Sequence, residues 1–539
     1  MRTLYSTFLF LLFSQHFAFA QEEKSVPNNW HLLDPQQDSV QGLSVEKTYN
    51  TLLKGKPARE VIVGVIDSGI DIDHEDLKDV IWTNTKEIAN NGIDDDKNGY
   101  VDDVHGWNFI GGKNGNVDAD TYELTREFMR LNKKYENVKD EKVGKKQKAE
   151  YEQYLKIKDK FEKLKGQNEA QYNLYSGIYK SLTESRDTLK ALMKKDTLAY
   201  ADIKAFESNE PHLLFAKGIL LQFYSRAGED VDLNEALNEL KEYVDYYTVI
   251  VKYGYNVDFD SRKIVGDNYA DVYEKYYGNN DVIGPDATHG THVAGIIAAN
   301  RTNNIGIKGI ADHVKIMVVR AVPNGDERDK DIANAIRYAV DNGAQVINMS
   351  FGKKFSPEKE AVDKAVKYAE AKGVLLVHAA GNESDDSDTE KNFPTRVYLN
   401  GKEAKNWVEV GASSWGADEN FVAEFSNYGK KSVSFFSPGV DIYSTTPKNT
   451  YAKESGTSMA SPATAGVAAL VMSYFPEFNV LEVKDILMKS TRKFDGLKVQ
   501  EPGDKKVVEF SGLSITGGLI NAYEAVKQAQ EMGKQKTVK

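Results

Sequence analysis

The chain has 539 residues, a formal net charge of −12 and no cysteine. A chain of this length forms two to four domains, or one large domain with an insertion. The acidic charge argues against a general nucleic-acid-binding protein, because attraction to phosphates requires a basic face. The lack of cysteine excludes disulfides, thiolate metal sites and cysteine nucleophiles. An exported form would therefore need another source of stability, such as bound calcium.

The first twenty residues have the features of a signal peptide. Arg2 gives a positive start, an apolar run follows over residues 8–13, and Ala18-Phe19-Ala20 is a small-x-small cleavage site. A membrane anchor is the alternative, but the apolar run is short for a span and polar residues follow it. No later stretch is long and apolar enough to cross a bilayer. We expect an exported protein, periplasmic or extracellular, with no stable membrane span.

A short lead-in over residues 21–58 precedes an α/β domain that we predict over residues 59–110 and 283–525. The strands are nearly continuous apolar runs, which is typical of strands buried on both faces of a parallel sheet. Apolar residues at helical spacing, each set ending near a glycine, predict helices over 331–342 and 357–372. This alternation predicts a doubly wound, mainly parallel sheet flanked by helices, with its active site at the carboxyl ends of the strands. The expected strands are Val61–Ile66, Val314–Val319, Val346–Met349 and Val374–Val377.

Residues 111–282 differ in character, and we predict a mostly α-helical insertion there, with a charged tail over residues 526–539. Residues 119–207 are rich in Lys, Glu and Tyr and contain no proline. Apolar and aromatic residues recur at helical spacing, which predicts two or three long amphipathic helices forming a hairpin. Both a solvated spacer and a lid or substrate-selecting arm remain open. The two stripes are Tyr151, Tyr154, Ile157, Phe161 and Leu164, and Leu174, Ile178 and Leu182.

Three motifs contain candidates for nucleophilic catalysis. Asp67 ends an apolar strand, His289 opens a helix of small residues, and Ser458 begins another helix with Pro462 expected in its first turn. Each alone fits an ordinary structural role: a turn residue, half of a His-x-x-His metal pair, or a helix N-cap. The Glu that zinc peptidases place beside the first His is missing, which argues against zinc. The motifs, with a fourth that contains Asn382, are Asp67-Ser68-Gly69-Ile70, His289-Gly290-Thr291-His292-Val293-Ala294-Gly295, Ala379-Ala380-Gly381-Asn382 and Gly456-Thr457-Ser458-Met459-Ala460-Ser461-Pro462.

These four motifs, in this order, resemble the subtilisin-like serine peptidase family. The resemblance covers the two α/β segments and not the helical insertion. It implies a subtilisin-like fold and a secreted serine endopeptidase acting on proteins or peptides. Asp67, His289 and Ser458 would form the catalytic triad, and Asn382 would donate to the oxyanion. The alternative is a non-catalytic peptide- or partner-binding protein on the same scaffold, which an intact triad and oxyanion asparagine argue against.

The resemblance also implies where substrate binds. The family pairs an extended peptide with the backbone edge after a core strand, here Ser350, Phe351 and Gly352, while Ala380 and Gly381 lie beside the oxyanion asparagine. Gly352 would let a peptide backbone approach closely; an ordinary strand-to-loop exit is the alternative. The segment after Asn382 is acidic, which is typical either of a solvated loop or of a pocket that prefers Lys or Arg.

Two calcium sites are predicted. Asp94, Asp96, Asn98 and Asp102 place oxygen ligands near a turn glycine, although the full EF-hand template fails because its last position falls on His105. An acidic turn without metal is the alternative. The second site rests on the resemblance: Asp76 with Asn303, Ile305 and Ile307 is similar to the family's common calcium site, with a carboxylate, an amide and backbone carbonyls.

Overall fold

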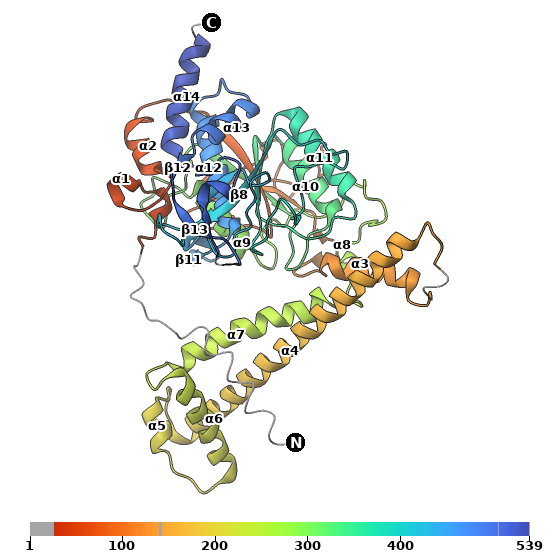
Figure 1. Cartoon of the computed structure of the whole chain (residues 1–539), viewed down its shortest axis with the longest axis vertical. Coiled ribbons are helices and arrows are strands. Elements are labelled where there is room, and N and C mark those ends of the chain that lie inside the picture. The colour runs from red at the N-terminus through yellow and green to blue at the C-terminus, as the bar shows by residue number, and fades with distance from the viewer. Residues whose placement is uncertain (1–25, 140–142, 505, 538–539) are drawn as a thin grey trace. The chain divides into compact units, whose positions relative to one another are not determined.

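A computed structural model describes residues 26–139, 143–504 and 506–537. The predicted signal peptide, residues 1–20, lies outside the described residues. The rest divides into two compact units, which we call the sheet unit (residues 26–127 and 258–537) and the helical unit (residues 128–257) (Figure 1). None of the described helices combines the length and apolar character of a membrane span.

The sheet unit is built on a nine-stranded sheet with the order β12-β15-β9-β8-β7-β6-β1-β5-β2. All neighbouring strands run parallel except β12 and β15. The central strands are buried along almost their whole length, as their continuous apolar sequences predict. The fold is therefore the predicted α/β fold with a mainly parallel sheet. The strands are β1 (Val61–Asp67), β2 (Gly106–Asn108), β5 (Val314–Arg320), β6 (Val346–Met349), β7 (Leu375–Ala379), β8 (Trp407–Ser413), β9 (Phe435–Pro438), β12 (Arg492–Lys493) and β15 (Gly518–Leu519).

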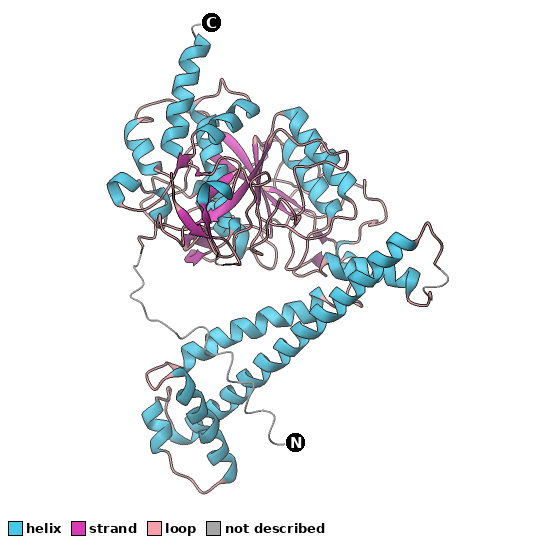
Figure 2. Cartoon of the chain, viewed as in Figure 1, coloured by secondary structure: helices cyan, strands magenta, loops and turns pink. Residues whose placement is uncertain are grey.

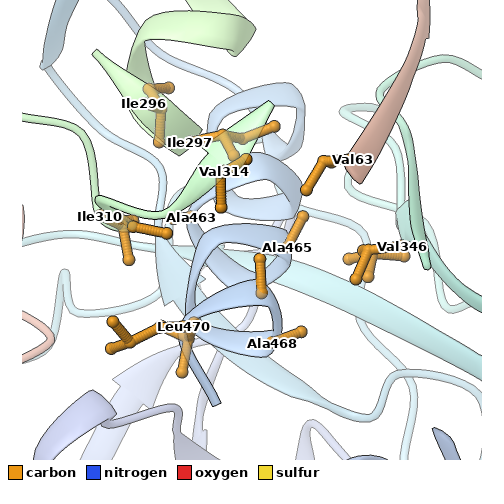
Figure 3. Close-up of a cluster of buried hydrophobic side chains, with 14 of the residues drawn as sticks. Val63, Ile296, Ile297, Ile310, Val314, Val346, Ala463, Ala465, Ala468 and Leu470 are labelled. Carbon is orange, nitrogen blue, oxygen red and sulfur yellow. The ribbon is translucent and has the colours of Figure 1, made fainter. Parts of the chain in front are cut away.

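Helices cover both faces of the sheet, and a large hydrophobic core lies on each face. On one face α9 and α12 pack on β1 and its neighbours, where Val63 and Val346 meet Ile296 and the small side chains of α12 such as Ala465 (Figure 3). Small residues let α12 lie close to the sheet and to the loop at Ile310. The other face carries α10 and α11. The helices are α9 (Thr288–Ala298), α10 (Asp329–Asp341), α11 (Lys359–Lys372), α12 (Thr457–Tyr474) and α13 (Val480–Lys489).

Both ends of the described chain contribute to the sheet unit. Trp30, Leu43 and Val45 of the lead-in are part of the core that also contains α12. The predicted charged tail begins inside a helix, α14, on which Val526 and Ala529 are buried in that same core. The charged residues of this segment lie on the exposed side of an amphipathic helix. The elements are α1 (Pro35–Asp38), α2 (Val45–Thr51) and α14 (Ala522–Thr537).

The helical unit is smaller than the predicted insertion of residues 111–282. Residues 111–127 and 258–282 belong to the sheet unit, because buried polar contacts tie them to it. Asp120 accepts hydrogen bonds from Arg328 and Ser261, and Arg262 pairs with Asp331 of α10. The small elements of these segments and of the later loops are β3 (Gly111–Gly112), β4 (Gly115–Asn116), α8 (Arg262–Val265), β10 (Ile442–Thr446), β11 (Thr450–Glu454), β13 (Lys498–Gln500) and β14 (Val507–Glu509).

The helical unit consists of helices and loops (Figure 2). Its longest helix, α4, packs against α6 and α7. The predicted stripe is present on α4, since Tyr151, Tyr154 and Phe161 are buried, and Phe128 of α3 stacks on Phe161 with a centroid distance of 4.2 Å. A second cluster joins α4 to α5, α6 and α7 around Leu220. The helices are α3 (Glu123–Tyr135, which begins in the sheet unit), α4 (Lys148–Met193), α5 (Tyr200–Ala205), α6 (Pro211–Ala227), α7 (Leu233–Val249) and a π-helical turn at Ile250–Gly254.

Candidate active site

Asp67 is the last residue of β1, an interior strand of the sheet between β6 and β5, and is only 2% exposed. Its Oδ1 accepts hydrogen bonds from the backbone N–H of Ser68 at 2.8 Å and from Nδ1 of His289 at 2.7 Å. Asp67 and His289 can approach each other this closely because glycines, Gly69 and Gly290, lie close to them in the chain. A Cβ on Gly290 would lie 2.1 Å from the Gly69 carbonyl oxygen, and Gly69 itself has a φ of 132°.

His289 lies in the first turn of α9, and its hydrogen bond to Asp67 determines its protonation. Partial burial alone would lower the pKa of the imidazole, but the charge of Asp67 and the hydrogen bond to it raise that pKa to about 9, with smaller contributions from Glu454 and Asp286. Because Nδ1 donates to a carboxylate, Nε2 is the atom left to exchange a proton with another group.

Ser458 lies in the first turn of α12, and α12 packs against α9. Its Oγ donates to the Ser350 carbonyl at 3.3 Å. Pro462 is in the second turn of α12, not in the first turn as expected. Proline has no N–H, so the Ser458 carbonyl lacks its helical partner. The Ser350 hydroxyl donates to that carbonyl at 2.9 Å instead, which joins the candidate nucleophile to the candidate substrate-binding segment.

Asn382 is held beside Ser458 by Thr457. Its Oδ1 accepts hydrogen bonds from the backbone N–H and from the hydroxyl of Thr457, each at 2.9 Å. The same hydroxyl accepts from the N–H of Gly381 at 3.1 Å. With Oδ1 occupied in this way, Nδ2 is the group of this side chain that remains to donate to a ligand. The importance of Thr457 was not inferred from the sequence, although it lies within the Gly-Thr-Ser-Met motif.

The candidate substrate-binding segment, Ser350–Gly352, follows β6 directly. Its far end is held by paired backbone hydrogen bonds between Lys353 and Phe393. A Cβ at Gly352 would lie 2.3 Å from Oδ1 of Asn392, so the side chain of Asn392 occupies the space beside the glycine. Asn392 also donates to the carbonyls of Ala379 and Ala380, and so links Ser350–Gly352 to the chain just before Asn382.

The acidic residues after Asn382 are largely engaged within the sheet unit. Lys354 donates to Asp385 at 2.6 Å and to Glu383 at 3.4 Å. Asp388 accepts hydrogen bonds from the backbone N–H of Lys431 and from the Ser432 hydroxyl. These contacts hold the loop in place and favour a structural role for its charges.

Comparison with known proteins identifies the family. The model of the subtilase family matches residues 58–512. The chain belongs to the subtilase family. The match spans the helical unit, because the peptidase sequence resumes after it.

Several serine proteases resemble this subtilase in sequence. The thermophilic serine proteinase of Bacillus sp. (strain AK1) is 38% identical over 271 residues, which are 50% of this chain and 58% of that protein. Thermitase of Thermoactinomyces vulgaris is 35% identical over 270 residues, 49% of this chain and 85% of that protein. A solved structure of a protease from Pseudoalteromonas arctica PAMC 21717 is 28% identical, with a TM-score of 0.38, and the alignment covers 47% of this chain and 78% of that one.

The predicted cation site of the subtilase at Asp76 is centred on a fully buried carboxylate. Its carboxylate accepts hydrogen bonds from Nδ2 of Asn303 at 2.7 Å and from the N–H of Ile307 at 3.0 Å. Burial raises the pKa of Asp76. A cavity of about 560 Å³ adjoins this loop, and Asn303, Ile305 and Ile307 are among its lining residues. A buried carboxylate beside an amide side chain supplies oxygen-ligand types that a hard cation prefers. In this structure Asn303 approaches Asp76 through its nitrogen, while its Oδ1 accepts from the N–H of Ile305.

At the other predicted site, the loop of Asp94, Asp96, Asn98 and Asp102, the structure groups a different set of residues. Oxygens of Glu87, Asp96 and Asp103 lie within 4.8 Å of one another, so these carboxylates could hold a metal ion. Asp96 is the only member of the predicted set in this cluster. Asn98 donates to Asp103 at 3.0 Å, while Asp94 and Asp102 accept hydrogen bonds from backbone N–H groups of the same loop. Burial raises the pKa of Asp103 to about 6, as expected for clustered carboxylates.

Proposed function

We propose that this subtilase is an exported serine endopeptidase, with Asp67, His289 and Ser458 as its triad. The 2.7 Å hydrogen bond between His289 and Asp67 carries the proposal. A buried carboxylate placed against an imidazole, at the carboxyl end of a central strand, is the arrangement that general-base catalysis requires. A peptide-binding scaffold without catalysis would need neither this pair nor the anchored Asn382, so the binding-protein alternative is disfavoured.

The residues divide the reaction between them. The Ser458 hydroxyl turns from the Ser350 carbonyl toward His289 Nε2, gives up its proton there and attacks the substrate carbonyl carbon. Asp67 stabilises the resulting imidazolium. Nδ2 of Asn382 and the backbone N–H of Ser458 donate to the oxyanion, where one donor typically contributes about 3 kcal/mol to lowering the barrier. His289 then protonates the leaving amine, and water releases the acyl group from Ser458.

The substrate is an extended stretch of protein or peptide whose backbone pairs with Ser350–Gly352, with Ala380 and Gly381 beside the reacting carbonyl. The Ser350 carbonyl lies next to the Ser458 hydroxyl, where a substrate backbone N–H could reach it. Gly352 is exposed, so its backbone is available for pairing.

Export and calcium complete the proposal. Residues 1–20 would direct the chain out of the cytoplasm and be removed after Ala20. Calcium would stabilise the folded protein at the loop of Asp76, Asn303, Ile305 and Ile307, and at the acidic loop. At the acidic loop, Glu87, Asp96 and Asp103 are the best-placed ligands, while Asp94, Asn98 and Asp102 shape the turn around them. Bound cations would serve structure in a chain that has no disulfide.

The test is hydrolysis of an unfolded protein by the purified exported chain and by its Ser458→Ala variant. We expect kcat to fall by about 10⁶-fold, as is typical when a triad nucleophile is removed. The melting temperature should be unchanged, because the substitution removes only one hydroxyl and one long hydrogen bond, of 3.3 Å. A folded Ser458→Ala variant that cleaves as fast as the parent would overturn the proposal and return the binding-protein alternative.

A further inference from the structure

A buried pair of ionisable side chains lies behind the candidate substrate-binding segment and takes no part in the triad. His378 is in β7, four residues before Asn382, and is 0% exposed. Glu409 lies opposite it on the neighbouring strand β8. His378 Nδ1 is 2.9 Å from Glu409 Oε1, and His378 Nε2 is 2.9 Å from the carbonyl oxygen of Phe351.

The two partners of His378 determine how many protons the pair holds. A carbonyl oxygen only accepts hydrogen bonds, and an ionised carboxylate also only accepts. An imidazole between two acceptors must donate from both nitrogens, which only the imidazolium can do. The second oxygen of Glu409 accepts a 2.6 Å hydrogen bond from Trp407 Nε1. With Trp407 Nε1 donating to one oxygen and His378 Nδ1 lying 2.9 Å from the other, an ionised Glu409 has a donor at each oxygen, and this arrangement favours placing the proton on His378.

The carbonyl that His378 holds belongs to the middle residue of Ser350–Gly352. The carbonyl of the preceding residue, Ser350, lies at the hydroxyl of Ser458. Two successive carbonyls of the segment therefore have side-chain partners. The Ser350 carbonyl is contacted by the Ser458 hydroxyl, and the Phe351 carbonyl is contacted by His378 of β7. Hydrogen bonds from a charged donor are roughly twice as strong as neutral ones, so this contact constrains the peptide orientation well.

We propose that His378 is a positioning residue for substrate binding: as an imidazolium paired with Glu409, it fixes the Phe351 carbonyl and so aligns Ser350–Gly352 for pairing with a peptide backbone. This rests on the proposed peptidase function. Its effect is on the binding of extended substrates, since His378 does not touch the reacting atoms. The rings of Trp407 and Phe351 pack against the imidazole with centroid distances of 5.2 and 6.3 Å and shield the pair from water.

The first test is spectroscopic and independent of activity. In protein labelled with ¹⁵N-histidine, both ring nitrogens of His378 should carry protons at about pH 7.5, where an ordinary exposed histidine is mostly neutral. A His378→Gln variant assigns the signals. A neutral, singly protonated ring at His378 would overturn the proposal, whether or not the chain proves to be a peptidase.

The second test separates substrate binding from chemistry. The double variant His378→Ala/Glu409→Ala removes both charges together, because losing one alone would leave the other buried and unpaired. We expect KM for a tetrapeptide anilide to rise about tenfold with kcat changed less than threefold. Turnover of p-nitrophenyl acetate, which has no peptide backbone to pair, should stay within about twofold of the parent.

The matched control is Tyr49→Phe, which removes a 3.0 Å hydrogen bond to Asp312 elsewhere in the sheet unit. It should lower stability and leave KM for the tetrapeptide unchanged. An unchanged KM in the double variant, or an equal loss toward the anilide and the acetate, would overturn the positioning role. Failure of the parent protein to hydrolyse either compound would instead count against the proposed peptidase function, and the spectroscopic test would still decide the protonation of His378.

Discussion

The sheet unit and the helical unit are stabilised by different means. In the sheet unit, continuous apolar strands are buried between two layers of helices, and some buried charged residues form paired networks, such as Asp120 with Arg328. In the helical unit, long amphipathic helices bury one stripe each, largely of aromatic and leucine side chains. Loss of a buried contact in the sheet unit should therefore lower the stability of that whole unit. Loss of a buried contact in the helical unit should destabilise the helical unit alone.

The largest effect is expected at Asp120 in the sheet unit. Its carboxylate accepts two hydrogen bonds from Arg328, at 2.7 and 3.0 Å. Burial would raise the pKa of Asp120, but Arg328 and Arg126 lower it to about 2. Asp120→Ala leaves the Arg328 side chain, 6% exposed, without this partner, and should lower the free energy of unfolding by about 3–5 kcal/mol.

Chemical denaturation of the sheet unit measures this loss, and Asp118→Ala is the control. Asp118 is exposed, and its carboxylate accepts a 3.3 Å hydrogen bond from Nδ2 of Asn324. Its substitution should change stability by less than about 0.5 kcal/mol. Equal effects at the two positions would show that the buried network does not join residues 111–127 to the sheet unit.

The next effect is expected at Leu220 of α6, which is 0% exposed within the cluster of the helical unit. Leu220→Ala should destabilise that unit by about 2–5 kcal/mol, because it removes buried methyl groups and leaves a cavity. Hydrogen exchange should then accelerate in residues 148–249 and not in β1 or β6. Hydrolysis of a short peptide should stay within about twofold of the parent.

Leu214→Ala on the same helix is the matched control, because Leu214 is 48% exposed. It should leave both exchange and hydrolysis unchanged. Exchange that accelerates equally in both units of the Leu220→Ala protein would mean that they unfold as one cooperative body.

The two units also differ in how much the sequence predicts. Four of the nine strands of the large sheet were predicted, each within about two residues of its observed bounds, and Val346–Met349 was predicted with its observed bounds. Continuous β-branched runs between helical patterns are typical of buried parallel strands and of few other elements. The helical unit was predicted as helices, since periodicity reports which face packs. Of the predicted stripe residues, the buried ones are Tyr151, Tyr154, Ile157, Phe161 and Leu182, while Leu164, Leu174 and Ile178 are half-buried. Where that unit begins and ends was not predicted.

The features that could not be predicted from the sequence depend on contacts between residues that are far apart in the chain. The boundary near residue 127 depends on Asp120 meeting Arg328 and Ser261, and neither pairing has a local signal. At the candidate site, the motifs identified Asp67, His289, Asn382 and Ser458. The use of Ser350 to satisfy the Ser458 carbonyl depends on a strand and a helix that are far apart in sequence.

A smaller effect is expected from removing calcium from the sheet unit. A ligand that binds only the native state at 100 times its Kd adds about 2.7 kcal/mol of stability. Chelation of protein shown to contain calcium should therefore lower its melting temperature. Asp76→Asn should reduce that response without abolishing it, since the Glu87, Asp96 and Asp103 cluster is separate. An unchanged melting temperature on chelation would contradict both sites.

The smallest effect is expected in the pH profile. His289 acts as a base only when neutral, so kcat/KM should increase as the pH rises through its pKa of about 9. Glu454 stabilises the charged form, so Glu454→Gln should move this rise to lower pH by about 0.5. Glu360→Gln, on the exposed side of α11, is the control. A shift to higher pH in Glu454→Gln would contradict the assignment of His289 as the base.

The most direct test of the central claim is the reaction of the folded protein with a serine-directed fluorophosphonate. An activated hydroxyl displaces fluoride and forms a stable phosphonyl ester that mass spectrometry can locate. We expect a single adduct, on Ser458, that is absent from Ser458→Ala and forms far more slowly in His289→Ala. No adduct on the folded protein, or an adduct on another serine, would contradict the claim that Asp67, His289 and Ser458 act together as a catalytic triad.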